Sequence, residues 1–156
     1  MKKEIHCKIN GEKRTFQADP CSTVVDVLRD VLSLTGTKSS CETGDCGACT
    51  ILWNGAAVNA CLLLANRMEG AEIITIEGVL KGGRLDPIQK AFVEEDAAQC
   101  GFCTPGFILR VKSLLRENPN PSEEEIKLAL AGNLCRCTGY IDIIAAVKNA
   151  ALKLKG

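Results

Sequence analysis

Long apolar runs, net charge and a leader segment are all missing from this sequence. Its 156 residues contain no stretch of eighteen apolar residues, so we expect no helix that spans a bilayer. Nineteen basic and nineteen acidic side chains cancel, which leaves no electrostatic reason to bind nucleic acid or an anionic membrane surface. Residues 1–5 are not followed by the apolar segment and cleavage site of a signal peptide. We therefore expect a cytoplasmic chain without nucleic-acid or membrane partners.

Histidine is also scarce, whereas cysteine is abundant. The single histidine, His6, lies on the outward side of an expected strand, and a Rieske centre would need two histidines. Ten cysteines in a small secreted protein would indicate a disulfide framework. Here 46% of the residues are apolar and can form a core without disulfides, so we interpret most of the cysteines as metal ligands or redox groups. Cys7 is expected to be a small core residue, and Cys21 has no partner at ligand spacing.

The first half of the sequence predicts a small mixed domain. Residues 5–9 alternate between apolar and polar side chains, as in a half-buried strand. Further strands are expected at residues 14–18, 51–53, 56–58 and 73–76, with turns at 11–12 and 54–55. A capping box formed by Thr23 and Asp26 predicts a helix that continues to about residue 32. Residues 35–50 lack periodicity and are expected to form a loop, so we predict an α+β domain over residues 1–78.

Beyond residue 78 the pattern is helical only. Residues 79–86 are interpreted as a linker. Capping residues at Asp86, Thr104 and Ser122 predict three helix starts, and a fourth helix is expected over residues 141–154. Four helices of about 11 to 15 residues with short connections predict a compact bundle over residues 87–156.

Four cysteines, which we name the first cysteine set, follow the spacing C-x4-C-x2-C-x11-C of plant-type [2Fe–2S] sites. They are Cys41, Cys46, Cys49 and Cys61. Three thiolates on one tight loop can surround a flat cluster only if the backbone wraps around it, and Gly44 and Gly47 permit the positive φ angles that this needs. Zinc is the alternative, but zinc loops usually pair their cysteines as two short knuckles, whereas Cys61 stands alone.

Four other cysteines, the second cysteine set, form one C-x2-C pair and one C-x-C pair. They are Cys100, Cys103, Cys135 and Cys137. In an extended C-x-C segment both sulfurs point to one face and Arg136 to the other, and the helix that starts after Cys103 directs its positive end toward the site. Taken alone, this spacing fits zinc as well as a cluster. Beside a plant-type loop, a second redox centre would have a use as a relay, whereas zinc would carry no electrons.

Three segments of the sequence closely resemble those of a known family. They are residues 41–50 (CETGDCGACT), 99–106 (QCGFCTPG) and 132–140 (GNLCRCTGY). Together they resemble the iron–sulfur subunit of molybdenum hydroxylases, the xanthine dehydrogenase family, in the form whose subunits are separate chains. The resemblance extends from the first strand to the last helix. One departure is Ser40, where many members have glycine, and this change would alter the cluster potential without removing a ligand.

The resemblance implies a fold and a set of cofactors. The fold would be a plant-type ferredoxin-like (β-grasp) domain followed by a four-helix-bundle [2Fe–2S] domain. The first cysteine set would hold a cluster that faces FAD on a medium subunit. The second would hold a cluster that faces molybdenum, bound to molybdopterin cytosine dinucleotide on a large subunit. Gln99 would hydrogen-bond the pterin through its side-chain amide.

The same resemblance implies a function. The chain would pass single electrons from the molybdenum–pterin site through the two clusters to FAD while the large subunit hydroxylates the substrate, and no substrate bond would be broken on this chain. We expect an N-heterocycle such as a purine, and the alternatives within the family are aldehydes, nicotinate, aromatic thioesters and carbon monoxide. A free ferredoxin-like carrier is the nearest rival, but such carriers are usually acidic and this chain is neutral.

Overall fold

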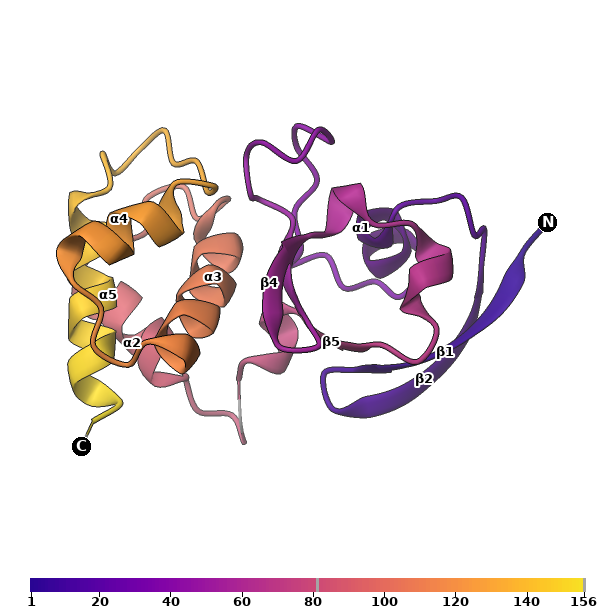
Figure 1. The fold of residues 1–156 in the computed structure, drawn as a ribbon, viewed down its shortest axis with the longest axis horizontal. Coiled ribbons are helices and arrows are strands. Elements are labelled where there is room, and N and C mark those ends of the chain that lie inside the picture. Colours follow the sequence, from indigo (N-terminus) through magenta and orange to yellow (C-terminus); the bar gives the residue numbers. More distant parts are fainter. Residues whose placement is uncertain (81, 156) are drawn as a thin grey trace.

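The chain folds as a five-stranded sheet followed by four helices, in a computed structural model that describes residues 1–80 and 82–155. The strands are β1 (Lys3–Ile9), β2 (Glu12–Ala18), β3 (Thr50–Trp53), β4 (Ala56–Asn59) and β5 (Glu72–Ile74), in the order β2-β1-β5-β3-β4. The β1–β5 pair is parallel and the other pairs are antiparallel. The sheet lies on the right in Figure 1 and the four later helices lie on the left. This segregation confirms the predicted α+β class.

One face of the sheet packs against a short helix. This helix, α1 (Val24–Asp26), begins at the predicted capping box, in which Thr23 and Asp26 bond to each other's backbone. It continues as a π-helical segment over Val27–Val31. The inward side chains of β1, among them Cys7, are buried against it. The core position predicted for Cys7 is therefore confirmed.

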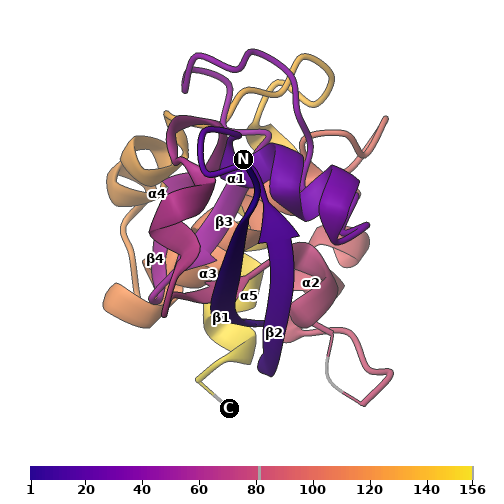
Figure 2. The ribbon, with the colours of Figure 1, turned by 90° about the vertical axis from the view of Figure 1, so that its right-hand side faces the viewer.

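The four later helices form the second half of the molecule. They are α2 (Pro87–Glu94), α3 (Thr104–Glu117), α4 (Glu123–Leu130) and α5 (Ile141–Lys153). Asp86 and Ser122 cap α2 and α4 through capping boxes, as predicted. Figure 2 views the molecule from the strand end, with the β1–β2 hairpin in front of the helices. Among the described residues, no helix is both long and apolar enough to cross a bilayer.

The sheet and the helices share a buried boundary. Successive side chains of a strand point to opposite faces, so Ile51 packs on the α1 side of β3 whereas Leu52 packs in the helical core. Val79, at the start of the expected linker, is also buried in the helical core. The Ala57 N–H donates to Ser113 Oγ on α3 over 3.3 Å. Packing and hydrogen bonding therefore join the two halves in addition to the chain itself.

Two boundaries in the first half differ from the sequence predictions. The first turn is Asn10-Gly11 rather than 11–12, because both residues adopt the positive φ angles of a tight hairpin turn. β2 therefore begins at Glu12. Ile76 lies in a 3₁₀ turn rather than in a strand. The ladder ends before it because the Thr75 N–H bonds to the Asn10 side chain at 2.8 Å instead of to a strand.

Two predictions for the second half also differ. Cys103, and not Thr104, precedes the first residue of α3, and its side chain makes no capping hydrogen bond. Helices α2 and α4 have eight residues each, shorter than expected, because turns end them earlier than the apolar pattern suggested. The predicted linker, residues 79–86, includes Lys81, which lies outside the described residues.

Candidate metal centres

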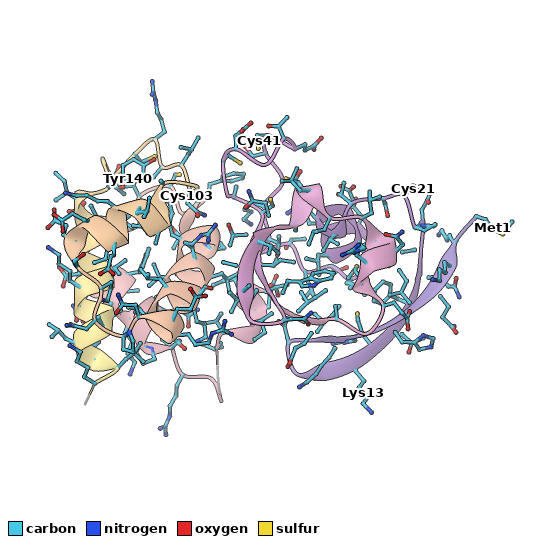
Figure 3. The ribbon with its side chains drawn as sticks, viewed as in Figure 1. Met1, Lys13, Cys21, Cys41, Cys103 and Tyr140 are labelled. Carbon is cyan, nitrogen blue, oxygen red and sulfur yellow. The ribbon has the colours of Figure 1, made fainter. Side chains whose placement is uncertain are left out.

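The first cysteine set occupies the loop before β3 and the turn after β4. Figure 3 shows Cys41 on this loop, at the same edge of the molecule as Cys103. The Cys46 N–H donates to the Cys41 sulfur over 3.4 Å. Gly44 has a φ of +86° and Gly47 a φ of +66°. These left-handed conformations fold the backbone around the sulfurs, as the glycine spacing predicted.

The pKa values of two thiols of the first set, Cys41 and Cys61, are shifted in opposite directions. Hydrogen bonds from the side chain and backbone of Thr43, and then from Cys46, lower the pKa of Cys41 to about 6. Burial, followed by the neighbouring Cys49 thiol, raises the pKa of Cys61 to about 12. The Cys61 thiol, whose pKa is raised, ionises at neutral pH only if a cation stabilises its thiolate, and a bound metal supplies that charge while releasing the proton. This chemistry fits a metal centre.

The second cysteine set lies at the start of α3 and between α4 and α5. The sulfurs of Cys100 and Cys137 are 3.7 Å apart. Burial, followed by the neighbouring Cys135 thiol, raises the pKa of Cys103 to about 12. The structure therefore brings the four sulfurs together as two pairs, Cys100 with Cys137 and Cys103 with Cys135.

Cys135 is surrounded by hydrogen-bond donors. Its sulfur accepts from the Thr138 hydroxyl at 3.2 Å and from the Thr138 N–H at 3.4 Å. Burial opposes ionisation of this thiol, but the donors outweigh it and lower the pKa of Cys135. The Cys135 N–H donates to the Tyr140 hydroxyl at 3.0 Å, and the Tyr140 ring packs edge-on against Phe107. Hydrogen bonds from Thr138 to the Cys135 sulfur and from the Cys135 N–H to Tyr140 thus hold the C-x-C loop in place.

A two-iron cluster and a single metal ion need different arrangements of the four sulfurs. Within residues 1–80 and 82–155, no three cysteine, histidine or carboxylate side chains converge closely enough to hold one metal ion. A structural zinc site needs four ligands around one point. A [2Fe–2S] cluster spreads four cysteines over two irons. The pairing of Cys100 with Cys137 is compatible with a cluster of this kind.

A buried junction joins the loops that carry the two sets. The Leu134 N–H donates to the Cys46 carbonyl oxygen over 2.9 Å. The Asn133 amide, 2% exposed, donates to the Gly47 carbonyl at 2.9 Å and to Thr50 Oγ1 at 3.1 Å. The sequence alone does not indicate these contacts, because the partners of Asn133 lie 86 and 83 residues away. The junction places the two candidate centres next to each other.

The second set opens onto the protein surface. Cys100 and Cys137 are both exposed, and Gln99 is exposed beside Cys100. Phe102, which precedes Cys103, and Leu134, which precedes Cys135, are apolar yet 45% and 55% exposed. This edge of the molecule therefore exposes both polar and apolar groups.

Comparisons with known proteins agree with this geometry. A 2Fe-2S iron-sulfur cluster binding domain matches residues 7–73, and a second [2Fe-2S] binding domain matches residues 75–148. The chain is 48% identical to the nicotinate dehydrogenase small FeS subunit of Eubacterium barkeri, over 94% of this chain and 93% of that one. It is 46% identical to the xanthine dehydrogenase iron-sulfur-binding subunit of Escherichia coli, over 92% and 91%.

A solved structure shares the complete fold. The crystal structure of quinoline 2-oxidoreductase from Pseudomonas putida 86 contains a chain that superposes with a TM-score of 0.96 at 45% identity, over 99% of this chain and 96% of that one. The two matched domains thus define a protein that carries two [2Fe–2S] clusters. The chain belongs to the iron–sulfur subunits of the molybdenum hydroxylase, or xanthine dehydrogenase, family. It is an electron-transfer subunit of a molybdenum-dependent oxidoreductase and performs no substrate chemistry itself.

Proposed function

We propose that this chain relays single electrons from a molybdenum–pterin site on a large subunit, through its two clusters, to FAD on a medium subunit during substrate hydroxylation. The observation that carries the proposal is the junction between the two cysteine-bearing loops, where the Leu134 N–H contacts the Cys46 carbonyl at 2.9 Å. Two one-electron centres on adjoining loops form a natural relay. Similarity over nearly the whole length to small subunits of larger enzymes supports it.

We assign the first cysteine set to the cluster that faces FAD and the second set to the cluster that faces molybdenum. Cys41, Cys46, Cys49 and Cys61 would hold the first cluster, and Cys100, Cys103, Cys135 and Cys137 would hold the second. When bound, each cluster takes up and releases one electron at a time. The donors aimed at the sulfurs, such as the Thr138 hydroxyl, stabilise the added negative charge.

The exposed edge at the second set supports a docking site for the large subunit. Phe102 and Leu134 expose apolar surface there, and exposed apolar surface is typical of interaction sites. We propose that Gln99, exposed beside Cys100, hydrogen-bonds the pterin.

We also propose that the chain is divided into a ferredoxin-like domain (1–78), a linker (79–86) and a helical domain (87–156), in line with the separate matches to residues 7–73 and 75–148.

For the substrate of the complex, we propose an N-heterocycle such as a purine. The relatives described above are named for nicotinate, xanthine and quinoline, and all three are N-heterocycles. Aldehydes are the second class to test, because a protein named aldehyde oxidoreductase, from Megalodesulfovibrio gigas, is 44% identical over 95% of this chain. This chain, as the electron carrier, does not select between them.

The proposal is tested by purifying the chain together with whatever binds it under native conditions. We expect two larger chains to copurify, one with molybdenum and one with FAD. The complex should contain about four iron and about four acid-labile sulfide per copy of this chain. Recovery of a brown monomer without molybdenum or flavin would instead indicate a free ferredoxin-like carrier.

Replacing Thr138 with valine should lower the midpoint potential of the second cluster. The change removes the hydroxyl that donates to the Cys135 sulfur at 3.2 Å. One hydrogen bond contributes about 1 kcal/mol, which corresponds to about 40 mV for one electron. Redox titration followed by electron paramagnetic resonance measures the shift, and Thr15→Val on the exposed β2 strand is the matched control. An unchanged potential in a fully loaded Thr138→Val variant would contradict the role assigned to this hydroxyl.

A further inference from the structure

Gly106, in the first turn of α3, lies against the loop that carries the first three cysteines, residues 41–49. It is buried, and it follows Cys103 of the second cysteine set by three residues. A Cβ built on Gly106 would lie 2.5 Å from the carbonyl oxygen of Gly47. Gly47 is itself next to Cys46 of the first set. Two segments that carry cysteines of different sets therefore meet backbone to backbone at these glycines.

The Gly47 carbonyl is held in this position by three hydrogen bonds. The Thr50 hydroxyl donates to it at 2.6 Å and the Thr50 N–H at 3.1 Å. The Asn133 amide donates to the same oxygen at 2.9 Å. Thr50 is 1% and Asn133 2% exposed, so turning the carbonyl away would leave buried donors without an acceptor, which is costly. The carbonyl therefore does not give way easily to a side chain on α3.

The backbone of α3 does not itself require glycine at position 106. Gly106 lies within the helix, and its φ is outside the left-handed region. At such a position alanine favours the helix more than glycine does. Glycine here therefore weakens the helix and needs another reason, such as the close approach of a second backbone. The Gly47 carbonyl supplies that reason, because it occupies the place of a Cβ.

We propose that Gly106 is a positioning residue for electron transfer, because its missing side chain lets the Gly47 carbonyl lie against α3 and so sets the separation of the two clusters. The inference rests on the proposed function, since it takes both cysteine sets as cluster ligands. A side chain at position 106 pushes the segment that carries Cys46 away from the segment that carries Cys103. Electron transfer between two centres slows steeply as they separate, so this contact keeps the relay fast.

The test is electron paramagnetic resonance of the full chain with both clusters bound and reduced. The magnetic interaction between the two centres splits their signals, and it weakens steeply with distance. We expect Gly106→Ala to lose part of the wild-type splitting. Gly132→Ala is the matched control, because Gly132 lies in the same junction, its φ is also outside the left-handed region, and its added Cβ would meet only Arg110, at 3.8 Å. The control should keep the full splitting.

An unchanged splitting in a Gly106→Ala variant that carries both clusters would overturn the proposal, whatever its thermal stability. If that variant does not hold both clusters, Asn133→Ala replaces it. This change removes the amide that binds the Gly47 carbonyl, and part of the splitting should again be lost. Full splitting in that variant, or failure of both variants to hold two clusters, would show that these residues serve folding and not spacing, and would overturn the proposal. The proposed function fails differently, because the wild-type protein itself would then lack two paramagnetic centres.

Discussion

A complex that carries Cys49→Ser on this chain should keep molybdenum reducible by substrate and lose reduction of the flavin. Cys49 is 3% exposed and lies beside the Cys61 thiol, so no neighbouring group can replace its sulfur. Clusters of this type are held by soft thiolate ligands, and a serine hydroxyl is a poor substitute. The first cluster should therefore be missing. The second cysteine set is unchanged, and its cluster should still be reduced.

Stopped-flow spectroscopy separates these events, because flavin and cluster absorbance can be followed in one mixing experiment with substrate. We expect flavin reduction below detection in the Cys49→Ser complex. Cys21→Ser is the control, because Cys21 is exposed and lies on the right side of Figure 3, away from both Cys41 and Cys103. Flavin reduction at the full wild-type rate in the Cys49→Ser complex would show that electrons reach FAD without the first cluster, against the relay.

The second large effect is expected at Gly47, in the junction between the two loops. A Cβ at this position would lie 2.3 Å from the carbonyl oxygen of Gly132 and 2.6 Å from the amide nitrogen of Asn133. The φ of +66° adds a left-handed penalty of about 1–2 kcal/mol for any residue with a Cβ, and overpacking adds about 1–3 kcal/mol. We expect Gly47→Ala to destabilise the protein by about 3 kcal/mol or more and to separate the loops.

Thermal unfolding and iron content measure this effect. Gly70→Ala is the matched control, because Gly70 has a similar φ of +71° but nothing within 4 Å of the added Cβ. The control should show only the backbone penalty of about 1–2 kcal/mol and should keep its iron. Equal losses of stability in the two variants, with full iron in both, would mean that the close contact at Gly47 does not hold the loops together.

Local features of the fold could be predicted because their causes lie within a few residues. The Thr23–Asp26 and Ser122–Glu125 capping boxes each span four residues, and both are present. The Asn54-Gly55 turn follows from its dipeptide and lies between β3 and β4. The two cysteine spacings could also be interpreted locally, because three ligands of the first set fall within nine residues. Short-range chemistry thus accounts for most of the elements.

The remaining features depend on contacts between distant residues. Asn133 is buried only because a loop 86 residues earlier supplies its acceptor, and no local pattern marks it. The spacing of the cysteines does not predict that Cys100 pairs with Cys137, because this contact forms only when α3, α4 and α5 pack together. The strand expected at residues 73–76 is too long because the side chain of Asn10, from the first hairpin, takes the Thr75 N–H. Tertiary contacts decide these points.

Two diiron centres on one short chain can be tested directly by electron paramagnetic resonance of the matured protein after reduction with dithionite. The relay predicts two distinct spin systems at low temperature, with about four iron and about four acid-labile sulfide per chain. Cys49→Ser should remove one system and Cys103→Ser the other. A silent spectrum from a sample whose cysteines bind zinc, or are joined to each other as disulfides, would contradict electron transfer by this chain.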